Sequence, residues 1–455
     1  MPDSIAEISE DAKDEADTLL RPEEAEARYE KFVWDNLPRN FAAHFLHGML
    51  GMTGFRLFNA PTFLPAYLHM LSGSDFIVGL GQSLQMVGGV VSPIVGAAHI
   101  EHRKRVLPVS MLMGTLMRLP MLGIALVGWF LQGQTQLLLV STMIFLFLMG
   151  IFSGAQGVAF QLLLAKVIPI ARRGRLQALR NIVGGAVAAG LSWAAGKWLI
   201  GSNAFGNGYA TTFFLAVVLT SIGLSLLAVL MREPEPPTVR SRARIIDRIR
   251  DFPGLIASDR SFGFFMLAQL CSSAGRIAAP FYILSAGHLI QLTGGNLANM
   301  SLAFLGADTL TNMIWGMSGD RFGFRSTFIA SLALWVAATA ILVAAPVLPA
   351  LGSMGPHVWI FVAFFGLGSA QSGQMMSSST MVLEFGTRDD MAMRLAFTQT
   401  AQGFTSALGP LCGGLIAGVL GYNVLFGISM GFLIGGLLVL VFLVQEPRGR
   451  LDRSA

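Results

Sequence analysis

Charged residues are scarce in this sequence, and their scarcity excludes an ordinary water-soluble protein. Of the 455 residues, 13% are charged and 53% are hydrophobic, and the mean hydropathy is +0.62. Soluble domains carry about 25% charged residues. Without a polar N-terminal stretch, a central polar stretch and the short C-terminal tail, more than four fifths of the chain remains. At about 30 residues per helix and connector, this part provides room for roughly twelve membrane spans.

Reactive and metal-binding motifs are also missing, which argues against most enzyme and cofactor classes. The two cysteines, Cys271 and Cys412, both lie in apolar runs and indicate neither a disulfide nor a metal site. The sequence contains no His-Glu-x-x-His, no histidine box, no phosphate-binding loop and no pair of acids within a span. We therefore predict a protein that is not an enzyme, needs no cofactor or metal, and has no nucleic-acid partner.

Twelve apolar runs predict an all-α integral membrane protein. The predicted spans are 41–71, 76–100, 106–131, 137–168, 176–200, 209–231, 261–287, 296–317, 326–349, 358–384, 395–419 and 422–445. We expect five parts: an acidic cytoplasmic tail (1–40), a first six-helix half (41–231), a cytoplasmic linker (232–260), a second six-helix half (261–445) and a short cytoplasmic tail (446–455).

The basic residues between the predicted spans lie almost entirely on alternate connectors. One set of connectors is rich in arginine, for example at 101–105, 172–175 and 232–260, whereas Lys197 is the only basic residue of the other set. Cytoplasmic loops carry the excess of Lys and Arg in membrane proteins. We expect a multi-pass plasma-membrane protein, in a bacterial inner membrane, with both termini in the cytoplasm.

The chain also contains an internal repeat. Five identical residues recur at offsets of 215–220: Arg56 and Arg276, Gly96 and Gly316, Gln156 and Gln371, Arg173 and Arg388, and Gly190 and Gly409. Two parallel halves around a central site are one of the architectures of secondary transporters. The repeat therefore predicts two pseudo-symmetric halves of six helices each.

A sequence motif at the end of the eighth predicted span points to a known family. The chain reads Gly-Met-Ser-Gly-Asp-Arg-Phe-Gly-Phe-Arg over 316–325. It resembles the Gly-x-x-x-Asp-Arg-x-Gly-x-Arg signature of the major facilitator superfamily. With twelve spans and the repeat, the resemblance covers residues 40–445 and implies a secondary transporter that works by alternating access, and we expect a monomer.

The resemblance implies gating roles for residues of this motif and for its weaker first-half copy. In the second half the residues are Gly316, Asp320, Arg321, Gly323 and Arg325, and Glu384 is the expected partner of the Arg321 guanidinium. The first-half copy has Glu101 where the signature has Arg. Glu101 can form a charge-swapped pair with Lys166, and a solvated surface pair of about 1 kcal/mol or less explains the two residues equally well.

Arg56 and Arg276 lie at matching depths, each roughly 22 Å from the start of its predicted span, the first and the seventh. Charged groups at this depth are costly and usually face a cavity. Two guanidiniums facing each other would clamp a doubly charged anion, which resembles the organic-phosphate antiporters of the superfamily. The Lys that follows the first Arg in that family is Leu57 here, and its His on the fifth helix is missing. In the competing interpretation Arg276 is neutralised by Asp308, without substrate contact.

Asp308 is the single carboxylate deep within a predicted span, so it is either the carrier of a coupled proton or a fixed partner of Arg276. Asn59 and Asn312 lie one helical turn from Arg56 and Asp308 and can line the same cavity. Gln156 and Gln371 are weaker candidates for substrate contact, because membrane glutamines often only join helices. We predict transport of a small molecule, with an organic or phosphate-bearing anion and H+ as candidate substrate and coupling ion. An exporter of amphipathic drugs or lipids is the alternative.

Overall fold

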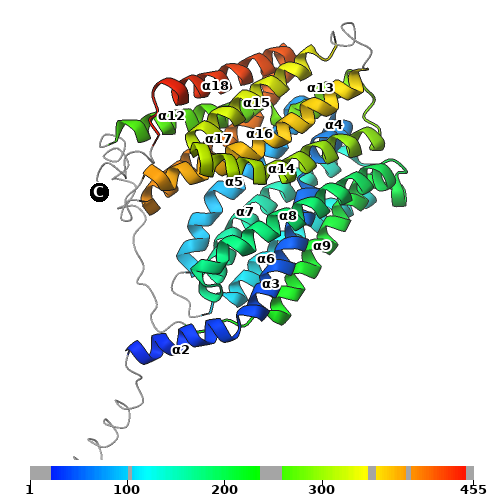
Figure 1. Ribbon diagram of the computed structural model, residues 1–455. Coiled ribbons are helices and arrows are strands. Elements are labelled where there is room, and N and C mark those ends of the chain that lie inside the picture. The colour runs from blue at the N-terminus through cyan, green and yellow to red at the C-terminus, as the bar shows by residue number, and fades with distance from the viewer. Residues whose placement is uncertain (1–21, 101–104, 236–258, 347–354, 386–390, 447–455) are drawn as a thin grey trace, which may run out of the picture.

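The computed structural model describes residues 22–100, 105–235, 259–346, 355–385 and 391–446, and within these ranges the chain is helical without any strand (Figure 1). The first half contains α2 (Pro22–Asp35), α3 (Leu37–Phe58), α4 (Phe63–Ser72), α5 (Asp75–Ile100), α6 (Leu107–Phe130), α7 (Thr135–Val167), α8 (Ile170–Ala194), η1 (Ala195–Ile200), η2 (Ala204–Gly206) and α9 (Gly208–Leu230). The second half contains α12 (Arg260–Gly275), η3 (Arg276–Phe281), α13 (Tyr282–Gly287), α14 (Gly294–Phe322), α15 (Phe324–Ala344), α16 (Pro356–Phe385), α17 (Met391–Leu420) and α18 (Tyr422–Phe442).

Apart from α2 and η2, the described helices group into twelve segments that coincide with the predicted spans. Among the described residues, seven helices are long and apolar enough to cross a bilayer on length and composition alone. The remaining segments are α3 with α4, α5, α8 with η1, α14 and α16. The predicted all-α multi-pass membrane protein is confirmed.

The first and seventh predicted spans each contain an interruption of the α-helix. The first span is interrupted between α3 and α4, where Pro61 lies, and the seventh contains the 3-10 segment η3, which includes Pro280. Proline removes a backbone N–H and clashes with the preceding helical turn. The two prolines are related by the same offset as the repeated pairs. Breaks of this kind are tolerated at membrane depth where the backbone lines a cavity.

Close packing within each half follows the same repeat. A methyl group on Gly150 of α7 would collide with the backbone oxygen of Gln85 on α5. Likewise, a methyl group on Gly368 of α16 would collide with the backbone oxygen of Phe304 on α14. Gly150 and Gly368 are themselves related by the offset of the repeat. Small residues let membrane helices approach closely. Equivalent close contacts therefore pack the helices within each half.

The alternation of the helices gives the molecule two distinct ends. The terminal end carries the start of α3 and α12 and the end of α9 and α18, and α2 lies at this end of the first half (Figure 1). The far end carries the connections from α4 to α5, from η1 to α9 and from α17 to α18. The halves meet where α5 lies beside α17 and α8 beside α14.

Candidate functional site

A cavity of about 720 Å³ lies between the two halves. From the first half it is lined by residues of α3 to α9, including His44, His47, Arg56, Asn59, Gln156 and Arg180. From the second half it is lined by residues of η3, α13, α14, α15 and α16, including Pro280, Asp308, Trp335 and Gln371. Ala60 and Pro61 from the break in the first span also reach it. Both interrupted helices therefore contribute to the same cavity.

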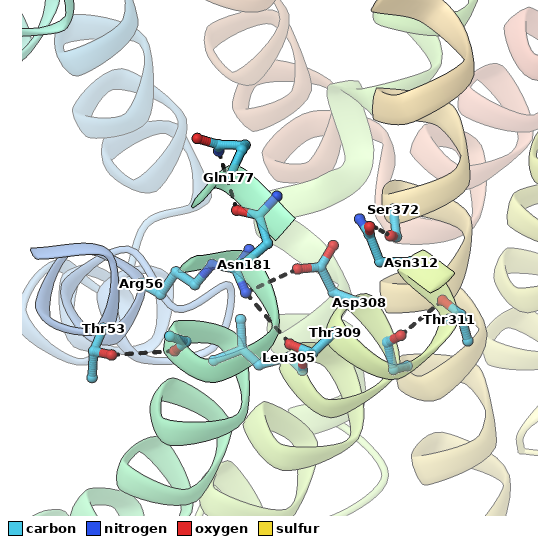
Figure 2. A network of polar contacts seen from close by, with 12 residues as sticks. Thr53, Arg56, Gln177, Asn181, Leu305, Asp308, Thr309, Thr311, Asn312 and Ser372 are labelled. Carbon is cyan, nitrogen blue, oxygen red and sulfur yellow. Dashed lines mark hydrogen bonds and ion pairs between the residues drawn. The ribbon is translucent and has the colours of Figure 1, made fainter. Parts of the chain in front are cut away.

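An ion pair between two lining residues of this cavity joins the halves. The Nη1 atom of Arg56 on α3 lies 3.2 Å from Oδ2 of Asp308 on α14, and the side chains are 24% and 16% exposed. The same nitrogen donates a long hydrogen bond of 3.5 Å to Oγ1 of Thr309. Figure 2 shows the Arg56 side chain extending toward these two residues of α14. Asp308 thus pairs with Arg56 rather than with Arg276.

Gly185 of α8 permits this contact. A methyl group at Gly185 would collide with the hydroxyl of Thr309 and would lie 2.9 Å from Nη1 of Arg56. The helices α8 and α14 therefore approach one another through a position without a side chain. Any larger residue would push apart the two halves at the level of the ion pair.

The predicted amide residues differ in their positions. Asn59, Gln156 and Gln371 line the cavity. The Nε2 atom of Gln85 donates to Oδ1 of Asn59 at 2.8 Å, which fixes the Asn59 amide beside the break in the first span. Asn312 is not among the lining residues; its Nδ2 donates to Oγ of Ser372 on α16 at 3.1 Å, as drawn in Figure 2. Asn312 thus joins two helices of one half.

Arg276 is also not among the lining residues. Its Nη2 atom lies 3.4 Å from Oγ of Ser273 and 3.4 Å from Oγ of Ser406 on α17. The cavity therefore contains Arg56 without Arg276, and the clamp of two arginines stays a prediction. The equal depth of the two residues was the reason to pair them, but depth does not determine which way a side chain points.

The far end of the molecule holds the two halves together. Thr62 and Ser301 share a short hydrogen bond, and Nε1 of Trp193 donates to Oδ1 of Asn299 at 3.2 Å. The hydroxyl of Tyr422 donates to Oδ1 of Asp75 at 2.8 Å. By contrast, the cavity extends toward the terminal end, where His44, Leu164 and Arg180 line it.

The signature motif forms the junction between α14 and α15. Asp320 and Arg321 lie in the last turn of α14, and Gly323, with a φ of 87°, is the single residue between α14 and α15. A methyl group there would lie 2.8 Å from the carboxylate of Glu446, so the conformation and the space both require glycine. A methyl group on Gly316 would lie 3.7 Å from the sulfur atom of Met376, an ordinary van der Waals contact.

The arginines of the motif have separate contacts. The guanidinium of Arg325 donates to the backbone oxygens of Leu440 and Val441 at 2.9 and 2.8 Å, and so caps the C-terminus of α18. Arg321 lies over the ring of Phe322 at 5.2 Å. Glu384 lies in the last turn of α16, and its pairing with Arg321 stays a prediction.

A carboxylate that the sequence analysis missed occupies the corresponding junction of the first half. Glu233, after α9, accepts hydrogen bonds from the backbone N–H groups of Val106 and Leu107 at 2.6 and 2.8 Å. It also pairs with Nζ of Lys166 at 3.1 Å. Glu101, the predicted partner of Lys166, lies outside the described residues. The signal for this role was present in the sequence, because Glu-Pro recurs at 233–234 and 446–447.

Comparisons with known proteins agree with this architecture. The sequence model of the Major Facilitator Superfamily matches residues 265–455. No curated protein matches the sequence. A mutant of nucleoside transporter NupG has a similar structure, with a TM-score of 0.67 and 14% identity over 88% of this chain and 99% of that chain.

Two further solved structures share the fold. A D-xylose-proton symporter matches with a TM-score of 0.68 and 12% identity over 91% of this chain and 99% of its own. A bacterial homologue of iron transporter ferroportin in an inward-facing state matches with a TM-score of 0.65 and 12% identity over 89% and 98% of the two chains. The family model of the Major Facilitator Superfamily thus matches the second half of the chain, and the whole bundle has the fold of these solved transporter structures.

Proposed function

We propose that this transporter carries an anionic small molecule together with a proton. Asp308 is the proton acceptor and Arg56 is the anion-binding group. The ion pair between them, 3.2 Å long and shared between the two halves, is the observation that carries this proposal. A proton on Asp308 removes the negative charge that holds Arg56, which leaves the guanidinium free to form paired hydrogen bonds with a carboxylate or phosphate.

The charge of the cavity supports an anionic substrate. Its described lining contains three arginines, Arg56, Arg118 and Arg180, and one carboxylate, that of Asp308. Treating both histidines as neutral, the formal charge of the lining is two units positive. A cavity of one sign with low-dielectric walls concentrates ions of the opposite sign. The cavity therefore favours anions over cations.

The orientation follows from basic residues at helix ends on the terminal side, such as Arg105, Arg172 and Arg232, which the positive-inside rule assigns to the cytoplasm. The cavity extends to that end at Leu164 and Arg180, while the halves are joined at the far end. Together these observations support an inward-facing conformation of a plasma-membrane protein. In the outward-facing conformation the far-end contacts of Thr62 and Tyr422 would be broken.

Uptake into proteoliposomes tests the proposal. The purified chain is screened with radiolabelled phosphate, aliphatic and aromatic carboxylates and, in parallel, the lipophilic cation tetraphenylphosphonium, with and without a pH gradient. We expect gradient-driven uptake of an anion. Asp308→Asn should abolish accumulation against a gradient but retain exchange, whereas Arg56→Gln should raise the half-saturating concentration at least tenfold. Glu235→Gln, which changes an exposed carboxylate outside the lining of the cavity, is the control. Uptake that is confined to cations or neutral solutes contradicts the proposal.

An exporter of amphipathic compounds is the second candidate, and the aromatic lining of the cavity favours it. Phe55, Phe160, Phe304, Trp335 and Phe364 all face the space between the halves. Aromatic rings bind flat apolar molecules regardless of charge. In the same screen this function gives proton-driven transport of tetraphenylphosphonium that Arg56→Gln leaves unchanged.

A further inference from the structure

A second group of basic side chains lies in the cavity, nearer to the terminal end than Arg56. It consists of His44 and His47 on α3, Arg118 on α6 and Arg180 on α8, which all line the cavity. His47 precedes Arg56 by two and a half helical turns, which corresponds to about 13 Å along the helix. His47 is in electrostatic range of Arg118, Arg180 and His44. We refer to these four residues as the inner basic cluster.

Several nitrogen atoms of this cluster have no partner within the described chain. Both ring nitrogens of His47, Nε2 of His44 and Nε of Arg180 are buried without a hydrogen bond. His44 and His47 are only 1% and 6% exposed. Leaving a buried donor or acceptor unsatisfied costs about 1–3 kcal/mol. Groups of this kind are rare in folded proteins, and an absent ligand is one of the explanations for them.

The walls of the cluster hold its side chains in position. Arg118 donates from Nη2 to the backbone oxygen of Thr220 at 2.6 Å and from Nη1 to that of Gly114. The ring of His47 stacks on Phe160, with 4.5 Å between the ring centres and 15° between the planes. Arg180 lies directly against Gly48, where a methyl group would collide with its guanidinium. Thus the space that the Arg180 head group occupies exists because residue 48 is a glycine.

The second half neutralises its corresponding arginine, whereas among the described residues no ion pair is formed by Arg180. Arg394 corresponds to Arg180, within one position of the offset that relates Arg173 to Arg388. Its Nη1 atom lies 3.5 Å from Oδ2 of Asp259, and its guanidinium covers the ring of Phe262 at 4.5 Å. Arg56 and Arg276 are 220 residues apart, and the residue 220 positions before Asp259 is Arg39. The next residue, Asn40, is also not a carboxylate. The position equivalent to Asp259 therefore offers Arg180 no carboxylate, and the described lining of the cavity around Arg180 contains no carboxylate other than Asp308.

We propose that the inner basic cluster is a second anion-binding subsite, which takes the carboxylate or phosphate group of the cargo between the Arg56 site and the terminal end. The proposal rests on an anionic cargo. Two guanidiniums with no carboxylate between them repel each other in a low-dielectric cavity. An oxyanion would remove this repulsion and accept hydrogen bonds from the free Nε of Arg180 and from an imidazole N–H. When the anion leaves Arg56, the subsite provides new hydrogen-bond donors, so the anion does not lose all of its hydrogen bonds at once.

Equilibrium binding of radiolabelled inorganic phosphate to the purified full chain in detergent micelles tests the subsite. At acidic pH, where Asp308 releases Arg56, we expect two phosphate ions per chain. Arg180→Gln should bind one, Arg56→Gln should bind one, and the double variant should bind none. Arg172→Gln removes an exposed arginine from the first turn of the same helix and should behave as the unchanged chain.

Gly48→Ala provides an independent variant that keeps every charge. It displaces the Arg180 guanidinium and should weaken the inner binding event at least tenfold, while the Arg56 event stays unchanged. Normal stoichiometry and affinity in both Arg180→Gln and Gly48→Ala overturn the subsite. A single phosphate that only Arg56→Gln removes overturns the subsite and leaves the proposed function intact. A single phosphate that only Arg180→Gln removes supports the subsite and contradicts the role of Arg56. No binding to the unchanged chain contradicts both.

Discussion

Arg56 and Asp308 should be strongly coupled in stability, and a double-mutant cycle can measure this coupling. The perturbations are Arg56→Gln and Asp308→Asn, alone and together, which remove the charges but keep polar side chains. At 3.2 Å the two unit charges attract by about 5 kcal/mol at an effective dielectric constant of about 20. Desolvation of both groups offsets much of this attraction. Removing one partner leaves an uncompensated charge at membrane depth, at a cost of about 3–5 kcal/mol.

Each single variant should therefore lose about 3 kcal/mol of unfolding free energy, and the double variant should lose little more than either one. The expected coupling energy is at least about 1.5 kcal/mol. The assay is reversible unfolding in mixed micelles, with unfolding free energies from a denaturing-detergent titration. Arg105 and Glu235 form a matched control pair, with Nη2 and Oε1 2.9 Å apart and side chains 66% and 54% exposed.

The exposed control pair should show a coupling energy below about 0.5 kcal/mol, because water and salt screen charges at the surface. Additive losses for Arg56→Gln and Asp308→Asn, equal within error to the sum of the single variants, would refute the reasoning. In that case the two side chains would interact with water or with other groups, and the ion pair could not hold the two halves together.

Three further variants test other contacts. Glu233→Gln weakens the cap on the N-terminus of α6 and should lower the unfolding free energy by about 2 kcal/mol in the same titration, whereas Glu235→Gln should have no effect. Gly185→Ala should reduce transport severalfold at normal expression, because overpacking between α8 and α14 costs about 1–3 kcal/mol; Gly190→Ala, which meets open space, is its control in the uptake assay. Tyr422→Phe removes one of the contacts that close the far end. The assay adds an impermeant thiol reagent from the far side and follows the labelling of a cysteine introduced into the cavity. Tyr422→Phe should raise the labelling rate severalfold, and an unchanged rate would argue against a closing role.

The sequence by itself determined the fold class, because membrane helices are encoded locally. A span needs an apolar run of sufficient length, and the bilayer leaves few other ways to satisfy the backbone. The internal repeat added the arrangement in two halves, and the motif that ends at Arg325 added the resemblance to a family. Pro61 and Pro280, which are related by the offset of the repeat, were a sequence signal for the breaks in the first and seventh spans. The uninterrupted apolar runs gave no sign of these breaks.

The tertiary structure decided which polar residues meet. The sequence placed Arg56, Arg276 and Asp308 at useful depths, but depth and spacing do not give the rotation of each helix about its axis. That rotation follows from packing with neighbouring helices, for example where Gly185 lets α8 approach α14. It directs Arg56 to Asp308 and Arg276 to Ser406. It also gathers the inner basic cluster from three helices that are distant in the sequence, which no local pattern can reveal.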